Sequence, residues 1–438
     1  AAAAAASSGG EPYARPERAA SLLHLAYLIE TRLGHDNSPA VRAAAFRAAA
    51  DARDAAPRAW RSLFGGGGKD GGDGSGERPC AGLAWCVAAG DPAAEARGEA
   101  ARFVGLLDGG GGCGEDGGPP TPPAPSASMR ASVLSHCGAM LGCRRASALH
   151  ELLNPTTASS SGGADGRDGG GRRGKAQRQQ QQAGTSSSSE GGGGGAEEAE
   201  ERYERTVLAS LAGLDALLRA LPEGGEGGER SADYSSDLFS GEAVVRLARS
   251  ASGPSFRRAA YGLLATACQC APSLVLPPKA DEEEGGATKA KAAAIPMAGL
   301  LPSLVSSERD PNNVPALLEA SLAYLAAFEG GSAGAWDGMD AAQFARGLSK
   351  TLRRACHGAD PRAWGPMALP LVASLPPAGA GSAPLELQVL AALWEGREAA
   401  ACPADGLAVS SAAAECAAHL LLRRPRGGGE EAGEAVPS

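Results

Sequence analysis

Aromatic side chains, isoleucine and lysine are all scarce in this chain of 438 residues. Aromatic residues make up 4% of it, and isoleucine occurs only at Ile29 and Ile295. Arginine supplies most of the 41 basic residues, a bias that we attribute to GC-rich codons. No run of about 18 apolar residues is present, so the sequence predicts no membrane-spanning helix.

The signals of several other classes are missing as well. Glycine does not recur at every third position, which excludes a collagen-like chain. The first residues lack the basic and apolar regions of a secretory signal. The chain also lacks an initiator methionine, so we expect a fragment or a mature chain. The net charge of −9 argues against nucleic-acid binding driven by overall charge, although local basic patches remain possible. We expect neither a membrane nor a DNA partner.

Glycine and proline, in contrast, are abundant, with 63 and 30 copies, and much of the glycine lies in polar, low-complexity stretches. Such stretches cannot bury enough apolar surface to offset the entropy of ordering. We therefore predict disorder at 1–14, 65–79, 154–200 and 426–438, a Gly/Pro-rich insert at 109–128, and loops at 222–237 and 277–292. The predicted folded parts are first helices at 15–64, helical segments at 80–153 and a main solenoid at 201–425.

The folded parts have the apolar spacing of amphipathic helices. Apolar residues recur every three or four positions, and no stretch alternates in the two-residue pattern of a strand. The abundance of alanine favours the same secondary structure. The clearest predicted helices are 16–33, 201–221, 239–251, 314–328, 341–356, 385–394 and 406–424.

Two of these regions share a repeated motif. Residues 38–46 and 253–261 both run Pro, one residue, a large apolar residue, Arg, two residues, Ala, aromatic. Proline suits the first position of a helix, and Ser38 or Gly253 can lie at the cap. The apolar residue, the alanine and the aromatic residue are expected on the buried face, with the arginine pointing away. Similar starts follow at Asp310-Pro311 and Asp360-Pro361. The fold class predicted is all-α, a HEAT/armadillo-type solenoid interrupted by long disordered linkers.

Residue patterns typical of catalytic or metal sites are not found. No two of the ten cysteines have the C-x-x-C spacing, and a metal site at His136, Cys137 and Cys143 is weakly supported. We expect all ten thiols to be reduced. The six histidines are scattered, and no phosphate-binding loop motif occurs. We therefore name no catalytic, cofactor-binding or metal-binding residue in this chain.

Arginine clusters give the one indication of a binding surface. Solenoids present such side chains on a continuous surface that can meet an acidic partner or RNA. A solvated helix face in an arginine-rich composition is the simpler explanation for any single one. The candidates for a partner-binding surface are Arg42, Arg47, Arg257, Arg258, Arg353 and Arg354.

Several short motifs also occur in an order along the chain that indicates a family resemblance. They are 39–46, an acidic run at 197–203 leading into 210–222, then 254–261, 310–320, Leu369-Pro370 and Ser410-Ser411 with Glu415-Cys416. In this order they resemble the N-terminal HEAT-repeat region of the listerin family. Members of this family are RING-type ubiquitin ligases of ribosome-associated quality control. The linker at 154–200 has no place in that pattern, and 80–153 matches it poorly.

The resemblance implies that the chain is the N-terminal part of a longer, cytosolic ligase. It implies docking on the large ribosomal subunit, alongside quality-control partners, near a stalled nascent chain. The RING, with its zinc ions and its ubiquitin-conjugating enzyme, would then lie beyond Ser438. A generic HEAT-repeat scaffold or adaptor unrelated to ubiquitin is the alternative, and an enzyme with its own active site is a third possibility.

Overall fold

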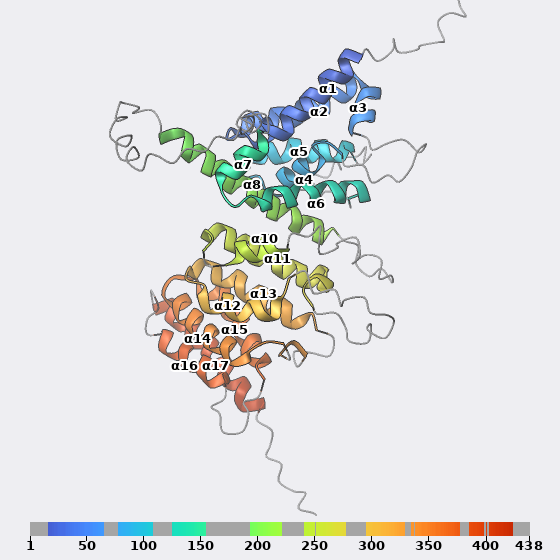
Figure 1. Cartoon of the computed structure of the whole chain (residues 1–438). Coiled ribbons are helices and arrows are strands. Elements are labelled where there is room, and N and C mark those ends of the chain that lie inside the picture. The colour runs from blue at the N-terminus through green and yellow to red at the C-terminus, as the bar shows by residue number, and fades with distance from the viewer. Residues whose placement is uncertain are drawn as a thin grey trace, which may run out of the picture. The chain divides into compact units, whose positions relative to one another are not determined.

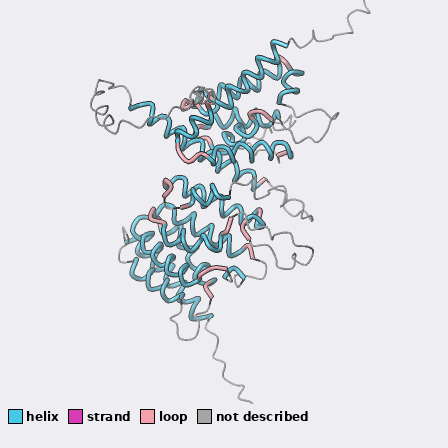
Figure 2. Tube along the Cα trace, viewed as in Figure 1, coloured by secondary structure: helices cyan, strands magenta, loops and turns pink. Residues whose placement is uncertain are grey.

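The computed structural model describes residues 16–64, 78–107, 125–154, 193–220, 241–249, 251–276, 295–328, 334–336, 338–376, 385–397, 400 and 403–423. The described parts consist of helices, short turns and loops, with no strand among them (Figure 2). The chain is therefore an all-α protein, as the apolar periodicity predicts. It divides into two compact units, with the boundary between Gly213 and Leu214.

The first unit contains α1 to α7 and most of α8, whose last residues lie beyond the boundary at Gly213 (Figure 1). Helix α2 packs against α5, α4 packs against both α5 and α6, and α1 packs against α2 and α3. The bounds are α1 Pro16–Thr31, α2 Pro39–Ala55, α3 Pro57–Phe64, α4 Ala81–Gly90, α5 Ala94–Leu107, α6 Ala127–Gly142, α7 Ala146–Leu153 and α8 Gly193–Arg219.

The second unit has two layers of helices. Helices α12, α14 and α16 pack in sequence in one layer, and α11, α13, α15 and α17 do so in the other. This alternation is that of an α-solenoid, in which each helix pair contacts its neighbours. The bounds are α10 Gly241–Ala248, α11 Pro254–Cys270, α12 Met297–Ser307, α13 Val314–Ala326, α14 Ala341–Gly358, α15 Pro361–Ser374, α16 Leu385–Arg397 and α17 Pro403–Arg423.

Proline marks the start of helices at the predicted places. Helices α2, α11 and α15 begin at Pro39, Pro254 and Pro361. At Asp310-Pro311 a short 3₁₀ turn, η5 (Pro311–Asn313), comes first, and α13 begins at Val314. The side chain of Asp310 accepts a hydrogen bond from the backbone N–H of Asn312. These prolines lack the N–H that a first turn leaves unsatisfied, so they fit the helix start.

The few aromatic side chains are concentrated in the two cores. In the first unit Phe103 packs edge to face with Trp60 and Phe64, with ring centroids 6.2 and 5.5 Å apart. Tyr261, Tyr324, Phe344 and Trp364 are among the largest fully buried side chains of the second. Each large ring removes much apolar area from water, which offsets the scarcity of isoleucine.

Several predicted linkers fall outside the described residues. This holds for the whole of 1–14, 222–237, 277–292 and 426–438, and for most of 65–79, 109–128 and 154–200. Two helices begin inside predicted linkers, α6 at Ala127 and α8 at Gly193. The start of α8 lies earlier than predicted because alanine and glutamate, which dominate 196–204, are strong helix formers.

Candidate functional site

The arginine of the repeated motif is buried in the first unit. Arg42 is 2% exposed and makes a two-pronged ion pair with Asp91, the residue that caps the C-terminus of α4. Its Nε donates to Oδ2 over 2.6 Å and its Nη2 to Oδ1 over 2.8 Å. Its Nη1 donates to the carbonyl oxygens of Asp36 and Asn37. The side chain therefore ties the turn before α2 to the end of α4.

The second copy of the motif repeats this arrangement in the second unit. Arg257 is 8% exposed, and its Nε and Nη2 each donate to a carboxylate oxygen of Glu308 over 2.9 Å. Glu308 caps the C-terminus of α12, the position that Asp91 has on α4. Nη1 of Arg257 donates to the carbonyl of Ser252, before α11. We call these two arrangements the arginine clamps.

The prediction that these arginines point away from the core is wrong. Each arginine lies four residues before the aromatic residue of the motif, Phe46 or Tyr261, and a spacing of four keeps two side chains on one face. The large apolar residue is only half-buried in both copies. Arg42 and Arg257 are both buried and paired with carboxylates, so neither presents its guanidinium at the surface of its unit.

Electrostatics at the second clamp favours the charged pair. Burial alone would raise the pKa of Glu308, but hydrogen bonds from Arg257, Tyr261 and the backbone of Asp310 outweigh it and lower the pKa. The Tyr261 hydroxyl donates to Glu308 over 2.7 Å, and burial raises the pKa of that tyrosine. The hydrogen bond and charge of Glu308 raise the pKa of Arg257. The carboxylate is thus held ionised.

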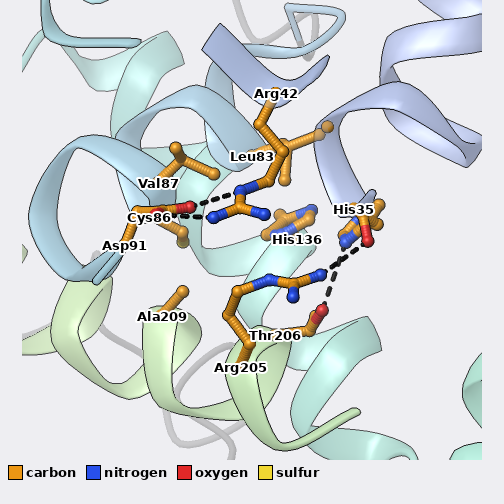
Figure 3. A pocket seen from close by; sticks show the side chains of 11 residues that line it. His35, Arg42, Leu83, Cys86, Val87, Asp91, His136, Arg205, Thr206 and Ala209 are labelled. Carbon is orange, nitrogen blue, oxygen red and sulfur yellow. Dashed lines mark hydrogen bonds and ion pairs between the residues drawn. The ribbon is translucent and has the colours of Figure 1, made fainter. Parts of the chain in front are cut away.

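A polar pocket lies beside the first clamp (Figure 3). The rings of His35 and His136 are stacked there with centroids 5.9 Å apart. His35 Nδ1 lies 3.3 Å from the hydroxyl of Thr206, whereas its Nε2 has no hydrogen-bond partner. Arg205 Nη2 donates to the carbonyl of His35 over 2.7 Å.

Burial lowers the pKa of His35 to about 3 and that of His136 to about 4. Both rings are therefore neutral at pH 7. The cavity volume is about 10 Å³, room for about one water molecule. We interpret this cluster as a polar part of the packed core, because a substrate or cofactor of ordinary size does not fit.

The described residues contain no group of three or more side chains suited to holding a metal ion. The eight cysteines in this part, among them Cys137 and Cys143, form no disulfide, and all except Cys270 are buried. Cys113 and Cys402 lie outside the described residues. No helix described is long and apolar enough to cross a membrane.

Three of the other candidate arginines are engaged within their own unit. Arg47 is exposed and pairs with Glu99 at 2.9 Å and with Glu95 at 3.4 Å, which links α2 to α5. Arg258 Nε donates to the side chain of Asn313 over 3.2 Å. Arg354 Nη1 donates to the backbone carbonyl of Glu308 over 2.6 Å. These three side chains hold neighbouring helices together.

Arg353 belongs to a different kind of surface. It lies on the exposed side of α14, together with Arg346, Lys350 and His357. We call these four residues the α14 basic face. The prediction noted only the Arg353-Arg354 pair, and the spacing of positions 346, 350, 353 and 357 is the signal that it missed.

An apolar depression lies on the other layer of the second unit. It has a volume of about 640 Å³ and is lined by residues of α11, α13 and α15, including Leu322, Ala326 and Met367. Nothing among its described neighbours shows what occupies it. It was not predicted, because its residues come from three helices far apart in the sequence.

A comparison with protein families identifies part of the chain. Residues 194–374 match the family model of the N-terminal domain of the E3 ubiquitin-protein ligase listerin. This region is therefore similar to the N-terminal domain of listerin. No curated protein and no solved structure matched the chain. The resemblance predicted from the ordered motifs is therefore confirmed for this region.

The listerin match includes most of α8 and the whole of α10 to α15. It therefore contains the Arg257–Glu308 clamp and the α14 basic face. The Arg42–Asp91 clamp lies outside it, although it has the same geometry. The shared geometry is independent support for treating both motif copies as repeats of one kind.

Proposed function

We propose that this chain is the N-terminal docking solenoid of a listerin-like RING-type ubiquitin ligase. The observation that carries the proposal is the match of 194–374 to the listerin N-terminal domain. The ligase would act on stalled nascent chains on the large ribosomal subunit, in the cytosol, with quality-control partners. The solenoid would hold the enzyme in place, because layered helix pairs present long lateral surfaces to a partner.

Transfer of ubiquitin would take place in another part of the polypeptide. A RING domain binds zinc through sets of cysteine and histidine ligands, and it would recruit the ubiquitin-conjugating enzyme. We name no residue of this chain for either role. The contribution of the solenoid would be to bring the transfer machinery close to the stalled chain, which raises its effective concentration there.

Co-sedimentation tests this proposal. The 438-residue chain is mixed with purified large or small ribosomal subunits and centrifuged through sucrose at several salt concentrations. We expect it to pellet with large subunits and to be released as salt rises from about 50 to about 200 mM. An adaptor unrelated to ubiquitin would stay in the supernatant with both subunits, and that result would contradict the proposal.

A further inference from the structure

The exposed side of α14 carries a continuous basic stripe. Arg346, Lys350, Arg353 and His357 follow one another at spacings of four, three and four, so they lie on one side of the helix. At a rise of 1.5 Å per residue the stripe is about 16 Å long. No acidic residue interrupts α14 between Asp340 and Asp360.

The side chains of the stripe make fewer ion pairs and hydrogen bonds within the unit than the arginines described above. Arg346 and Lys350 form no ion pair among the described residues. Arg353 pairs with Glu395 of α16 at 2.5 Å, and both side chains are more than half exposed. An exposed pair of this kind contributes at most about 1 kcal/mol, so a phosphate can replace the carboxylate.

The helices beside α14 add little negative charge to this surface. Helix α12, MAGLLPSLVSS, has no charged residue. Ser306 of α12 lies so close that a Cβ on Gly347 would be 3.0 Å from its backbone nitrogen. Glu395 is the one exposed acidic side chain of α16. A negatively charged partner would therefore meet little repulsion along α14.

An exposed tryptophan directly precedes the carboxylate partner of Arg353 in the sequence. Trp394 precedes Glu395 on α16 and is 55% exposed. The guanidinium carbon of Arg397 lies 3.8 Å from the centroid of its ring. An exposed aromatic ring close to a cationic side chain is typical of proteins that bind single-stranded nucleic acid, where bases stack on the ring.

We propose that the α14 basic face binds the phosphate backbone of RNA and that Trp394 stacks on an unpaired base. The inference deepens the proposed function, since on the large subunit the RNA would be ribosomal. Arg346, Lys350 and Arg353 would each form an ion pair with a phosphate. For Arg353, the phosphate would replace Glu395 as the partner. We favour RNA over an acidic protein because the exposed ring offers stacking that a row of carboxylates does not use.

Charge reversal on the stripe tests the inference. The triple variant R346E/K350E/R353E is compared with R61E/R144E/R145E, which changes the net charge equally at exposed arginines of the first unit. Both are made in the full chain and checked by circular dichroism. The probes are large ribosomal subunits, a fluorescein-labelled oligouridylate, and polyglutamate as the acidic polypeptide.

We expect the stripe variant to bind oligouridylate with an affinity at least about 10-fold lower. The slope of log affinity against log salt concentration should become shallower by about 2, the effect of three lost contacts to single-stranded RNA. The control variant should keep both. Equal binding by the two variants would overturn the inference. So would polyglutamate binding as tight as that of the RNA, since it would indicate an acidic protein as the partner.

The ribosome measurement separates the inference from the proposed function. If the unaltered chain does not pellet with large subunits, the proposed function fails, whatever the RNA result. If it pellets and the stripe variant pellets equally well, the proposed function stands and the inference fails. Loss of pelleting in the stripe variant alone supports both.

Trp394 gives a test that does not change the charge. Trp394→Ala should weaken oligouridylate binding about 10-fold, the order expected for one stacked base, while the salt slope stays the same. Trp394→Phe keeps a ring and should retain most of the affinity. Unchanged affinity in Trp394→Ala would refute the stacking role.

Discussion

At the scale of single residues, one buried arginine in each motif copy ties its helix to the C-terminal end of a later helix. In each clamp one guanidinium satisfies a carboxylate at the end of one helix and a carbonyl before another. Removing one partner leaves the other charged and buried without compensation, which costs far more than the pair itself contributes. The clamps are therefore sites of high sensitivity to mutation.

The second clamp gives a quantitative prediction. Glu308→Ala should lower the free energy of unfolding by about 3–5 kcal/mol, because Arg257 is then buried and unpaired. Arg257→Met with Glu308→Leu should recover much of this loss, since two apolar side chains need no partner. The measurement is urea unfolding of the full chain, followed by circular dichroism. The control Arg258→Ala, at an exposed arginine, should cost no more than about 1 kcal/mol. A loss below about 1 kcal/mol in Glu308→Ala would contradict the clamp.

The buried histidines predict a loss of stability in acid. The pKa of His35 is near 6.5 in the unfolded chain and about 3 in the folded one, so the unfolded state binds more protons between these values. The contribution of His35 to the free energy of unfolding is complete above about pH 6.5. It decreases as the pH falls, and roughly 3 kcal/mol of it is lost at pH 4. His136 acts in the same direction.

The measurement is the free energy of unfolding from pH 7.5 to 4. His35→Gln, which cannot take up a proton, should flatten this dependence by up to one proton. His24→Gln is the control, because His24 is not buried. An identical pH dependence in His35→Gln and the unaltered chain would show that His35 is not buried as a neutral ring.

At the scale of helices, small residues set how closely neighbours approach. A Cβ on Gly82 of α4 would collide with the backbone of Ser132 and lie 2.6 Å from Cβ of His136, both on α6. Gly98 of α5 has no atom within 4 Å of the corresponding position. The two glycines are thus a matched pair within one unit, one at a helix crossing and one on an open face.

The two substitutions to alanine should have opposite signs. Gly82→Ala forces α4 and α6 apart and should destabilise the chain by about 1–3 kcal/mol. Gly98→Ala should stabilise it by up to about 1 kcal/mol, because alanine is the better helix former. Thermal unfolding at one scan rate measures both. A stabilising Gly82→Ala would show that the crossing is looser than the structure describes.

At the scale of the whole molecule, each unit has its own core, and apolar side chains remain exposed on the last described helices. Leu407 of α17 is 73% exposed, and Leu387 and Trp394 of α16 are exposed as well. Solenoids need a polar outer face on their terminal repeats to stay soluble. The described part of this end exposes these apolar side chains, so we expect the chain to self-associate.

Leu407→Glu should reduce that self-association. The unaltered chain should show an apparent mass that rises with concentration in analytical ultracentrifugation, and the variant should show a smaller rise. Leu152→Glu, at an exposed leucine of the first unit, is the control and should change it less. A concentration-independent mass for the unaltered chain would contradict the prediction.

The sequence by itself determined several of the helices and where they start. Apolar spacing and proline positions depend on residues within one or two turns, so α1, α2, α11, α13 and α15 could be located from local patterns. The order of motifs also pointed to the listerin family, and the match at 194–374 confirms it.

Only the tertiary structure decided what each arginine does. Arg42 and Arg257 find their carboxylates 49 and 51 residues away in the sequence, at the ends of helices that no local pattern connects to them. Arg353, in contrast, is more than half exposed and pairs with Glu395, an equally exposed residue of another helix. The same residue type in similar local patterns is therefore a buried clamp in one place and an exposed cation in another, because packing between distant helices sets its surroundings.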